Sequence, residues 1–413
     1  MLRDILFYGF ARAVPGVAGI FVVVMLLRAF STDVYGVYAL VFAAANAISI
    51  LASGWINQSV LRFVPGRETL SSALVGAIAR SGTWSVMFAF VAAGVLLLVV
   101  APSESRGTLL VALTAGILAF SLVAAAIVSS LLQARGMAAQ VAVLEGLRCL
   151  LWVSAVAVGV RWGELSSESA LVLSAASYLS ATLAVVALTG RAGLVGQRSE
   201  SAQESQWDWI REFSKFGMPM SCWLGLMVSM PFFDRFIIER MIDIQATGVY
   251  AARYDLLFRG ASVMMGPLTL ALHPAVMRAS NRGSREEVRR IVMRSLFGLT
   301  IMSLLVAGVG WLVVPRLFGM GGFDSSGISA MEAAGFIAAG CSWQIGLIAH
   351  KLLETQRRTA LILLLMFGAS SINIALNLAF VPMMGYQAAI VSSLAAGLFY
   401  VGSSLYFGLR EFR

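Results

Sequence analysis

Charged side chains interrupt an otherwise apolar stretch in the middle of the chain. Within FFDRFIIERMIDIQATGVYAARYDLLFRG, residues 232–260, Arg253 and Arg259 flank Asp255. A guanidinium group offers a planar fork of N–H donors that suits an oxyanion, and a carboxylate four residues away on a helix can neutralise it. Asp255 and Arg259 have that spacing, whereas Arg253 has no acid three or four residues away. Arg253 therefore either pairs with an acid on another segment, for which Asp234 is a candidate, or is available to an anion.

Other charged residues lie in apolar runs elsewhere. Arg12 has no acid one helical turn away, so it either binds an anion or extends its charge to the membrane surface. Glu145 and Arg148 are three residues apart and are expected to pair on one helix. Asp234 and Arg235 come late in their apolar run. They are expected to be mainly charges at the membrane–water interface, where they could form a gate.

The composition restricts what class of protein can contain these charges. The chain has 413 residues, of which 59% are hydrophobic and 12% charged, and its mean hydropathy is +0.85. Soluble domains carry about 25% charged residues. The three cysteines and two histidines have no metal-site or disulfide spacing, and no glycine-rich nucleotide loop is present. These features predict an all-α polytopic membrane protein without a catalytic or metal site.

Apolar runs of sufficient length to cross a hydrocarbon core of about 30 Å recur along the whole chain. They predict about twelve transmembrane helices. These are expected near residues 9–29, 35–60, 83–101, 107–133, 138–160, 169–190, 213–238, 246–275, 291–314, 329–353, 359–382 and 385–408. The even-numbered connections hold most of the arginines, so the positive-inside rule places these connections and both termini in the cytoplasm. This topology and anionic lipids account for the net charge of +9, and no nucleic-acid partner is expected.

An internal similarity suggests two halves. A shift of 212 residues aligns YGVY (35–38) with TGVY (247–250). We therefore expect an N-lobe of six helices at 1–190, a cytoplasmic linker at 191–212 and a C-lobe of six helices at 213–413. With an even number of helices in each half, a pseudo-twofold axis along the membrane normal would relate the lobes, with a central cavity between them.

Two longer segments resemble a known family. RAFSTDVYGVYALVFAAANAISILASGWINQSVLRFVPG (28–66) resembles the second-helix region of polysaccharide flippases of the O-antigen (Wzx) type. These belong to the multidrug/oligosaccharidyl-lipid/polysaccharide (MOP) exporter superfamily. INIALNLAFVPMMGYQAAIVSS (372–393) is similar to the C-terminal signature of that family. The matching positions are Asn373, Asn377, Pro382, Gly385 and Ala389.

The resemblance implies a transporter, not an enzyme. It implies two six-helix bundles that move an undecaprenyl-diphosphate-linked oligosaccharide to the periplasmic leaflet of a bacterial inner membrane, for O-antigen, capsule or exopolysaccharide synthesis. The expected partners are this lipid-linked sugar, membrane lipids, and a polysaccharide polymerase with other assembly proteins. No cofactor is expected, and a proton or sodium gradient is the candidate energy source.

If the chain is such a flippase, the charged residues are expected to bind the substrate or to act as charge partners and gate. The residues expected to bind the diphosphate are Arg253, Arg259, Arg12 and Arg148. The residues expected to act as charge partners or gate are Asp255, Asp234, Arg235 and Glu145.

Two alternatives remain open. A cation-coupled multidrug exporter of the same superfamily should carry a lone acid in an early helix, and the first three expected helices contain none. A glycan polymerase or ligase needs a sizeable periplasmic loop with catalytic side chains, whereas the odd-numbered connections are short.

Overall fold

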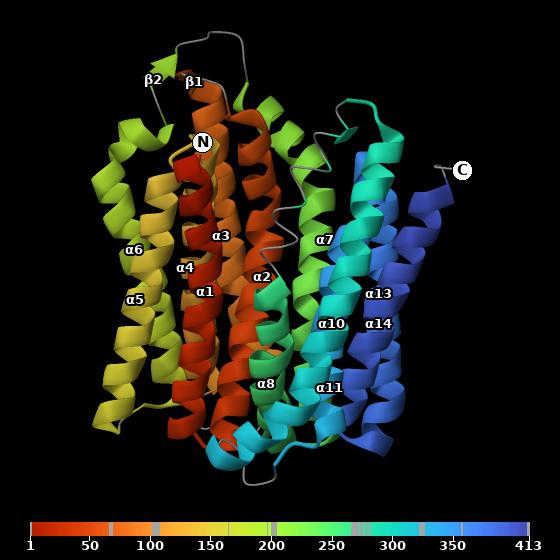
Figure 1. Ribbon diagram of the computed structural model, residues 1–413. Helices are drawn as coiled ribbons and strands as arrows, with labels where there is room; N and C mark the ends of the chain where they lie inside the picture. Colours follow the sequence, from red (N-terminus) through yellow and green to blue (C-terminus); the bar gives the residue numbers. More distant parts are fainter. Residues whose placement is uncertain are drawn as a thin grey trace. The chain divides into compact units, whose positions relative to one another are not determined.

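The computed structural model describes residues 2–65, 69–100, 108–163, 165–195, 197–199, 205–265, 272, 276, 279–280, 282–321, 327–356 and 358–410. Long helices make up nearly all of it (Figure 1). The first six are α1 (Leu2–Ala29), α2 (Thr32–Phe63), α3 (Ser72–Val100), α4 (Thr108–Ala134), α5 (Ala138–Trp162) and α6 (Ser167–Val195). The later ones are α7 (Gln206–Met241), α8 (Ile244–Arg253), α10 (Arg285–Gly321), α11 (Ala330–Ala349), α12 (Lys351–Thr355), α13 (Thr359–Met384) and α14 (Gln387–Arg410).

The expected all-α membrane fold is confirmed in its helices. Among the described residues, eleven helices are long and apolar enough to cross a membrane. Each of these overlaps one of the expected runs. The structure adds one feature that the sequence did not indicate, a parallel pair of three-residue strands, β1 (Thr69–Ser71) and β2 (Gln197–Ser199).

The run expected at 246–275 is not a regular helix. It begins as α8, continues through a π-helical stretch, η1 (Tyr254–Phe258), and is helical again to Met265. The Arg259 N–H bonds the Tyr254 carbonyl, five residues back. Most of 266–275 lies outside the described residues. A π-helical stretch widens the helix by one residue and is frequent at functional sites.

The chain forms two compact units. Unit 1 comprises Met1–Met25 and Val37–Phe232, and unit 2 comprises Leu26–Gly36 and Phe233–Arg413. The chain therefore passes from one unit to the other inside α1, α2 and α7. The expected lobes at 1–190 and 213–413 remain a prediction about the protein in its membrane.

Small residues hold α7 against α2 in unit 1. A Cβ at Gly217 would collide with the backbone of Trp55. One turn further along α7, the Ser221 hydroxyl donates hydrogen bonds to the carbonyls of Ile50 and Leu51, at 3.2 and 3.0 Å. Membrane helices associate through this kind of close backbone approach, because lipid tails provide no hydrophobic drive between apolar surfaces.

In unit 2 a glycine likewise allows a close backbone approach, between α8 and the first turn of α2. A Cβ at Gly248 would collide with the backbone of Thr32, so only glycine permits this approach. The fully buried Tyr35 follows on α2. The core of the unit gathers apolar side chains from α7, α8, α10, α11, α13 and α14, among them Ile238, Tyr250 and Phe336. The same unit contains five of the charged residues that the sequence singled out, Asp234, Arg235, Arg253, Asp255 and Arg259.

Candidate functional site

One buried carboxylate in unit 2 is surrounded by neutral donors. Asp234 in α7 is 1% exposed. The Asn377 amide donates to its Oδ1 at 2.7 Å, and the Tyr250 hydroxyl donates to its Oδ2 at 2.7 Å. The Ser393 hydroxyl also donates to Oδ2, at 3.3 Å. Every one of these partners is uncharged, so hydrogen bonds alone stabilise the carboxylate.

More neutral oxygens lie around Asp234. The Asn377 amide also reaches Asn373 Oδ1 at 3.4 Å, and the Ser392 hydroxyl donates to Asn377 Oδ1 at 2.9 Å. We call Asp234, Asn373, Asn377, Ser392 and Ser393 the Asp234 cluster. An ionised carboxylate buried without a counter-charge is costly, and protonation or a bound cation lowers that cost. Carboxylate, amide and hydroxyl oxygens are ligands that hard cations prefer.

A second buried acid, Asp255, is compensated by arginines. It lies in η1 and is 5% exposed. Arg235 Nη2 is 2.8 Å and Arg259 Nε is 3.1 Å from its Oδ1, and the Tyr35 hydroxyl donates to its Oδ2 at 2.9 Å. The expected Asp255–Arg259 pair is confirmed. The Arg235–Asp255 pair, which joins α7 to η1, was not expected.

The structure corrects the expectation that Asp234 and Arg235 are charges at the membrane–water interface. Both side chains are 1% exposed. Asp234 is covered by α13 and α14, and Arg235 is covered by η1, where it also lies 5.6 Å from the ring centre of Tyr254. The position of the two residues late in an apolar run does not predict that α13, α14 and η1 pack over them.

Arg253 pairs with an acid that the sequence did not suggest. Its Nη1 lies 2.5 Å from Glu332 Oε1 and also contacts the Tyr386 hydroxyl, while its Nη2 donates to the Gly327 carbonyl at 2.6 Å. Glu332 therefore replaces Asp234 as its partner. Glu332 lies in the first turn of α11 and Tyr386 immediately precedes α14. Arg253 consequently lies level with the N-terminal ends of α11 and α14.

The four arginines expected at an anion site differ in accessibility. The side chain of Arg253 is 2% exposed and that of Arg148 is 7% exposed, whereas that of Arg259 is 42% exposed. Arg259 contacts Asp255 through Nε, and its two Nη groups form no hydrogen bond with another described residue. The side chain of Arg12 lies outside the described residues.

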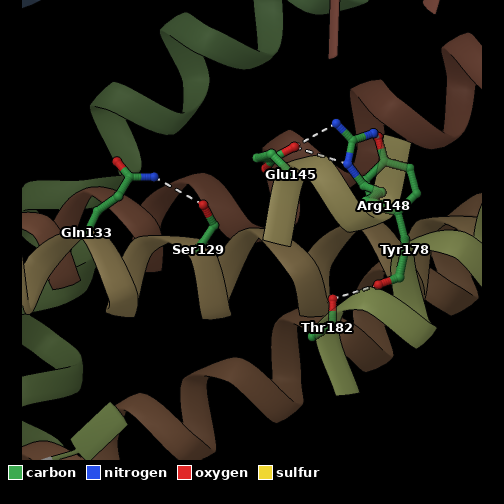
Figure 2. A network of polar contacts seen from close by, with 6 residues as sticks. All are labelled: Ser129, Gln133, Glu145, Arg148, Tyr178 and Thr182. Atoms are coloured by element: carbon green, nitrogen blue, oxygen red, sulfur yellow. Dashed lines mark hydrogen bonds and ion pairs between the residues drawn. The ribbon is translucent and has the colours of Figure 1, made fainter. Parts of the chain in front are cut away.

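The expected pairing of Glu145 with Arg148 in unit 1 is confirmed. Both Arg148 Nε and Nη2 donate to Glu145 Oε2, at 3.0 and 2.6 Å, and Arg148 Nη1 donates to the Tyr178 hydroxyl at 2.7 Å (Figure 2). Glu145 and Arg148 come from α5, and Tyr178 comes from α6.

Sequence reasoning missed several residues that complete these clusters. Asn373 and Asn377 were recognised only as positions of a family signature, although two amides four residues apart in an apolar helix are themselves a sign of a polar site. Tyr35, Glu332 and Tyr386 gave no such sign. Their partners lie 220, 79 and 133 residues away along the chain.

Comparisons with known proteins identify the fold. No family model matches the chain, and no curated protein matches it. Among solved structures, the lipid II flippase MurJ in an inward closed conformation matches with a TM-score of 0.69 at 12% identity, over 99% of this chain and 88% of that chain. An inward-facing multidrug resistance MATE family transporter of the MOP superfamily matches with a TM-score of 0.65 at 12% identity, over 97% and 94%.

A eukaryotic MATE transporter, AtDTX14, matches with a TM-score of 0.62 at 13% identity, over 98% of this chain and 95% of that chain. The likeness extends over nearly the full length of each protein, and the identities are too low to indicate more than a shared fold. The chain is therefore a multi-pass membrane protein with the fold of MATE transporters and MurJ.

Proposed function

We propose that this chain is a flippase that moves an undecaprenyl-diphosphate-linked oligosaccharide across the bacterial inner membrane by alternating access. The fold supports a transporter, because proteins of this fold include the lipid II flippase MurJ and multidrug MATE transporters. The resemblance of residues 28–66 and 372–393 to polysaccharide flippases supports the substrate class. The product would serve O-antigen, capsule or exopolysaccharide synthesis, with both termini of the chain in the cytoplasm.

The observation that carries the substrate assignment is the exposed side chain of Arg259. A charged side chain facing lipid at the bilayer centre costs about 2.5–3.5 kcal/mol on insertion scales and more by other estimates. An arginine that is 42% exposed within an apolar segment is therefore explained by a water-filled path. Its free Nη donors match the oxygens of a diphosphate. Arg253 and Arg148, whose donors face protein partners, position helices in this proposal.

The function is tested by translocation in proteoliposomes. Purified protein is reconstituted with a fluorescent undecaprenyl-diphosphate-linked oligosaccharide, and the fraction that reaches the outer leaflet is measured by an enzyme that modifies only exposed sugar. We expect translocation by the wild-type chain and at least a tenfold slower rate for Arg259→Gln, since a charge-assisted contact to phosphate is worth about 1.5–3 kcal/mol.

The matched control is Arg282→Gln. Arg282 also pairs with one acid, Glu287 at 3.5 Å, but its side chain is 64% exposed and lies outside the apolar helices. This variant should translocate like wild type. No translocation by the wild-type protein, or equal rates for the wild type and Arg259→Gln, would contradict the proposal.

We further propose that the Asp234 cluster takes up the coupling ion, either sodium or a proton. Support comes from the neutral partners of Asp234, which leave its charge to be balanced by a bound cation or by protonation. If sodium binds, replacing choline chloride with sodium chloride should raise the melting temperature of the wild-type protein and not that of Asp234→Asn. If the melting temperature is insensitive to sodium in both proteins, the proton remains as the coupling ion.

The second candidate function is a cation-coupled multidrug exporter. The match to MATE transporters and the Asp234 cluster favour it. However, the accessible charge in unit 2 at Arg259 is positive, while Asp234, Asp255 and Glu332 are all buried. A cationic drug would be repelled by Arg259. Export of cationic dyes without translocation of the lipid-linked sugar would establish this alternative.

A further inference from the structure

Unit 1 contains an ion pair in which all three nitrogens of the arginine already contact protein groups. Arg148 uses Nε and Nη2 on Glu145 and uses Nη1 on the Tyr178 hydroxyl, with its guanidinium carbon 4.4 Å from the centre of the Tyr178 ring. Figure 2 shows both contacts to Glu145 ending on the same carboxylate oxygen. Arg148 is thereby committed to fixing the orientation of Glu145.

The carboxylate of Glu145 has one oxygen, Oε1, that Arg148 does not contact. Both contacts from Arg148 end on Oε2, and Oε1 receives no hydrogen bond from the described part of the chain. The Glu145 side chain is 22% exposed, three times the 7% of its partner. The ion pair therefore presents its acidic side outward and its basic side inward.

The position of Glu145 along α5 decides what it faces. It is the eighth residue of a 25-residue helix, about 10 Å from the start at 1.5 Å per residue. A carboxylate at this depth is unfavourable against acyl chains, and intramembrane acids face the protein interior or a water-filled cavity. Its exposed oxygen therefore faces water or a polar ligand.

The Glu145–Arg148 pair is electrically neutral as a whole. This neutrality favours an uncharged hydrogen-bond donor over an organic cation as the ligand. A lone carboxylate beside an aromatic ring would attract an organic cation. Here Arg148 already balances the charge of Glu145, so the attraction for a second cation is weak. What remains is a rigid, strong hydrogen-bond acceptor beside the ring of Tyr178, which suits donors without charge.

We propose that Glu145, positioned by Arg148 and Tyr178, is a sugar-binding residue that accepts hydrogen bonds from hydroxyl groups of the transported oligosaccharide. This inference rests on the proposed function and assigns a sugar contact to unit 1. It also gives Arg148 a role different from diphosphate binding. Glu145 binds the substrate, whereas Arg148 and Tyr178 act through it as positioning residues.

The test compares two lipids that differ only in the sugar. Binding of undecaprenyl diphosphate and of undecaprenyl-diphosphate-linked N-acetylglucosamine is measured by native mass spectrometry or by fluorescence in nanodiscs. We expect the sugar-bearing lipid to bind wild type about tenfold more tightly, the size of effect that one hydrogen bond to a charged acceptor gives. In Glu145→Gln an amide replaces the charged acceptor, and we expect this preference to fall below about threefold.

Two further variants make the result specific. Glu212→Gln is the matched control, because Glu212 also pairs with a cation three residues away but its side chain is 53% exposed near the start of α7; it should keep the full preference. Tyr178→Phe removes the hydroxyl that holds Arg148 and should reduce the preference partly. Unchanged affinity for the sugarless lipid shows that each variant is folded. If Glu145→Gln does not fold, Tyr178→Phe carries the test.

Each outcome is decisive. Equal binding of the two lipids by the wild-type protein, or a preference kept in Glu145→Gln and in Tyr178→Phe, overturns the sugar-binding role and leaves the flippase proposal intact. If neither lipid binds to wild type, the flippase proposal itself fails and this inference fails with it. Tetraphenylphosphonium is the third probe. If it binds to wild type and is lost in Glu145→Gln while sugar binding is unchanged, Glu145 is a cation-binding residue and the inference is wrong.

Discussion

Asp234 and Asp255 lie in the same unit and are almost equally buried, yet they are stabilised in opposite ways. Asp255 has two arginines and a tyrosine on its carboxylate, whereas Asp234 has only amide and hydroxyl donors. A buried acid between arginines has its charge balanced by the protein and holds segments together. A buried acid among neutral groups has no such balance within the protein, and in our proposal an ion or a proton from outside supplies it. We therefore interpret Asp255 as structural and Asp234 as the residue that changes its state.

If arginines stabilise buried acids as they do at Asp255, the largest loss of stability is expected where a buried acid loses its only arginine among the described residues. Glu332, which pairs with Arg253, is such an acid. Arg253→Ala leaves Glu332 buried and without that counter-charge, and should cost about 3–5 kcal/mol in the free energy of unfolding. The measurement is the unfolding of purified protein in detergent, together with its abundance in the membrane. Loss of export in this variant would then report on folding. Normal stability would contradict the structural role of the Arg253–Glu332 pair.

A smaller loss is expected at Asp255, because one arginine remains when the other is removed. Arg235→Gln should cost about 2–3 kcal/mol, since Arg259 still contacts Oδ1 of the same carboxylate. The double variant Arg235→Gln with Asp255→Asn should recover part of this loss, because no charge is then left buried without compensation. A double variant that is less stable than the sum of both single variants would refute the coupling between the two residues.

At Asp234 the expected change in stability is small. Asp234→Asn keeps the shape of the side chain, and the Asn377 amide and Tyr250 hydroxyl can reorient toward an amide group. We expect a change within about 1 kcal/mol, measured as above. The control is Asp208→Asn, an exposed acid in the first turn of the same helix. A loss as large as that at Arg235 would show that Asp234 is a structural charge, and the distinction between the two acids would fail.

The smallest effect on folding is expected at Arg259. The side chain of Arg259 is 42% exposed, and Arg235 still contacts Asp255 when Arg259 is replaced. Arg259→Gln should therefore cost about 0–1 kcal/mol and unfold at nearly the same temperature as wild type, while translocation is at least tenfold slower. This combination separates Arg259 from Arg253, although the sequence analysis assigned both to diphosphate binding. A variant of Arg259 that is strongly destabilised would place it among the structural arginines.

Features set by local geometry could be predicted from the sequence. Apolar runs mark the positions of the membrane helices, and spacings of three and four residues on a helix indicate the Glu145–Arg148 and Asp255–Arg259 pairs. The Arg253–Glu332 pair could not be predicted, because the two residues lie 79 positions apart and only the packing of α11 beside η1 brings them together. The burial of Asp234 and Arg235 depends in the same way on α13, α14 and η1, which cover the end of α7.

The most direct test of the account uses one translocation assay with two imposed gradients. Proteoliposomes containing wild type or Asp234→Asn receive a sodium gradient or a proton gradient, and translocation of an undecaprenyl-diphosphate-linked oligosaccharide is followed. We predict that one gradient accelerates wild type and that neither gradient changes the rate of Asp234→Asn. If neither gradient accelerates the wild type, or if the same gradient accelerates both proteins equally, a neutrally surrounded Asp234 is not the coupling residue and the account is contradicted.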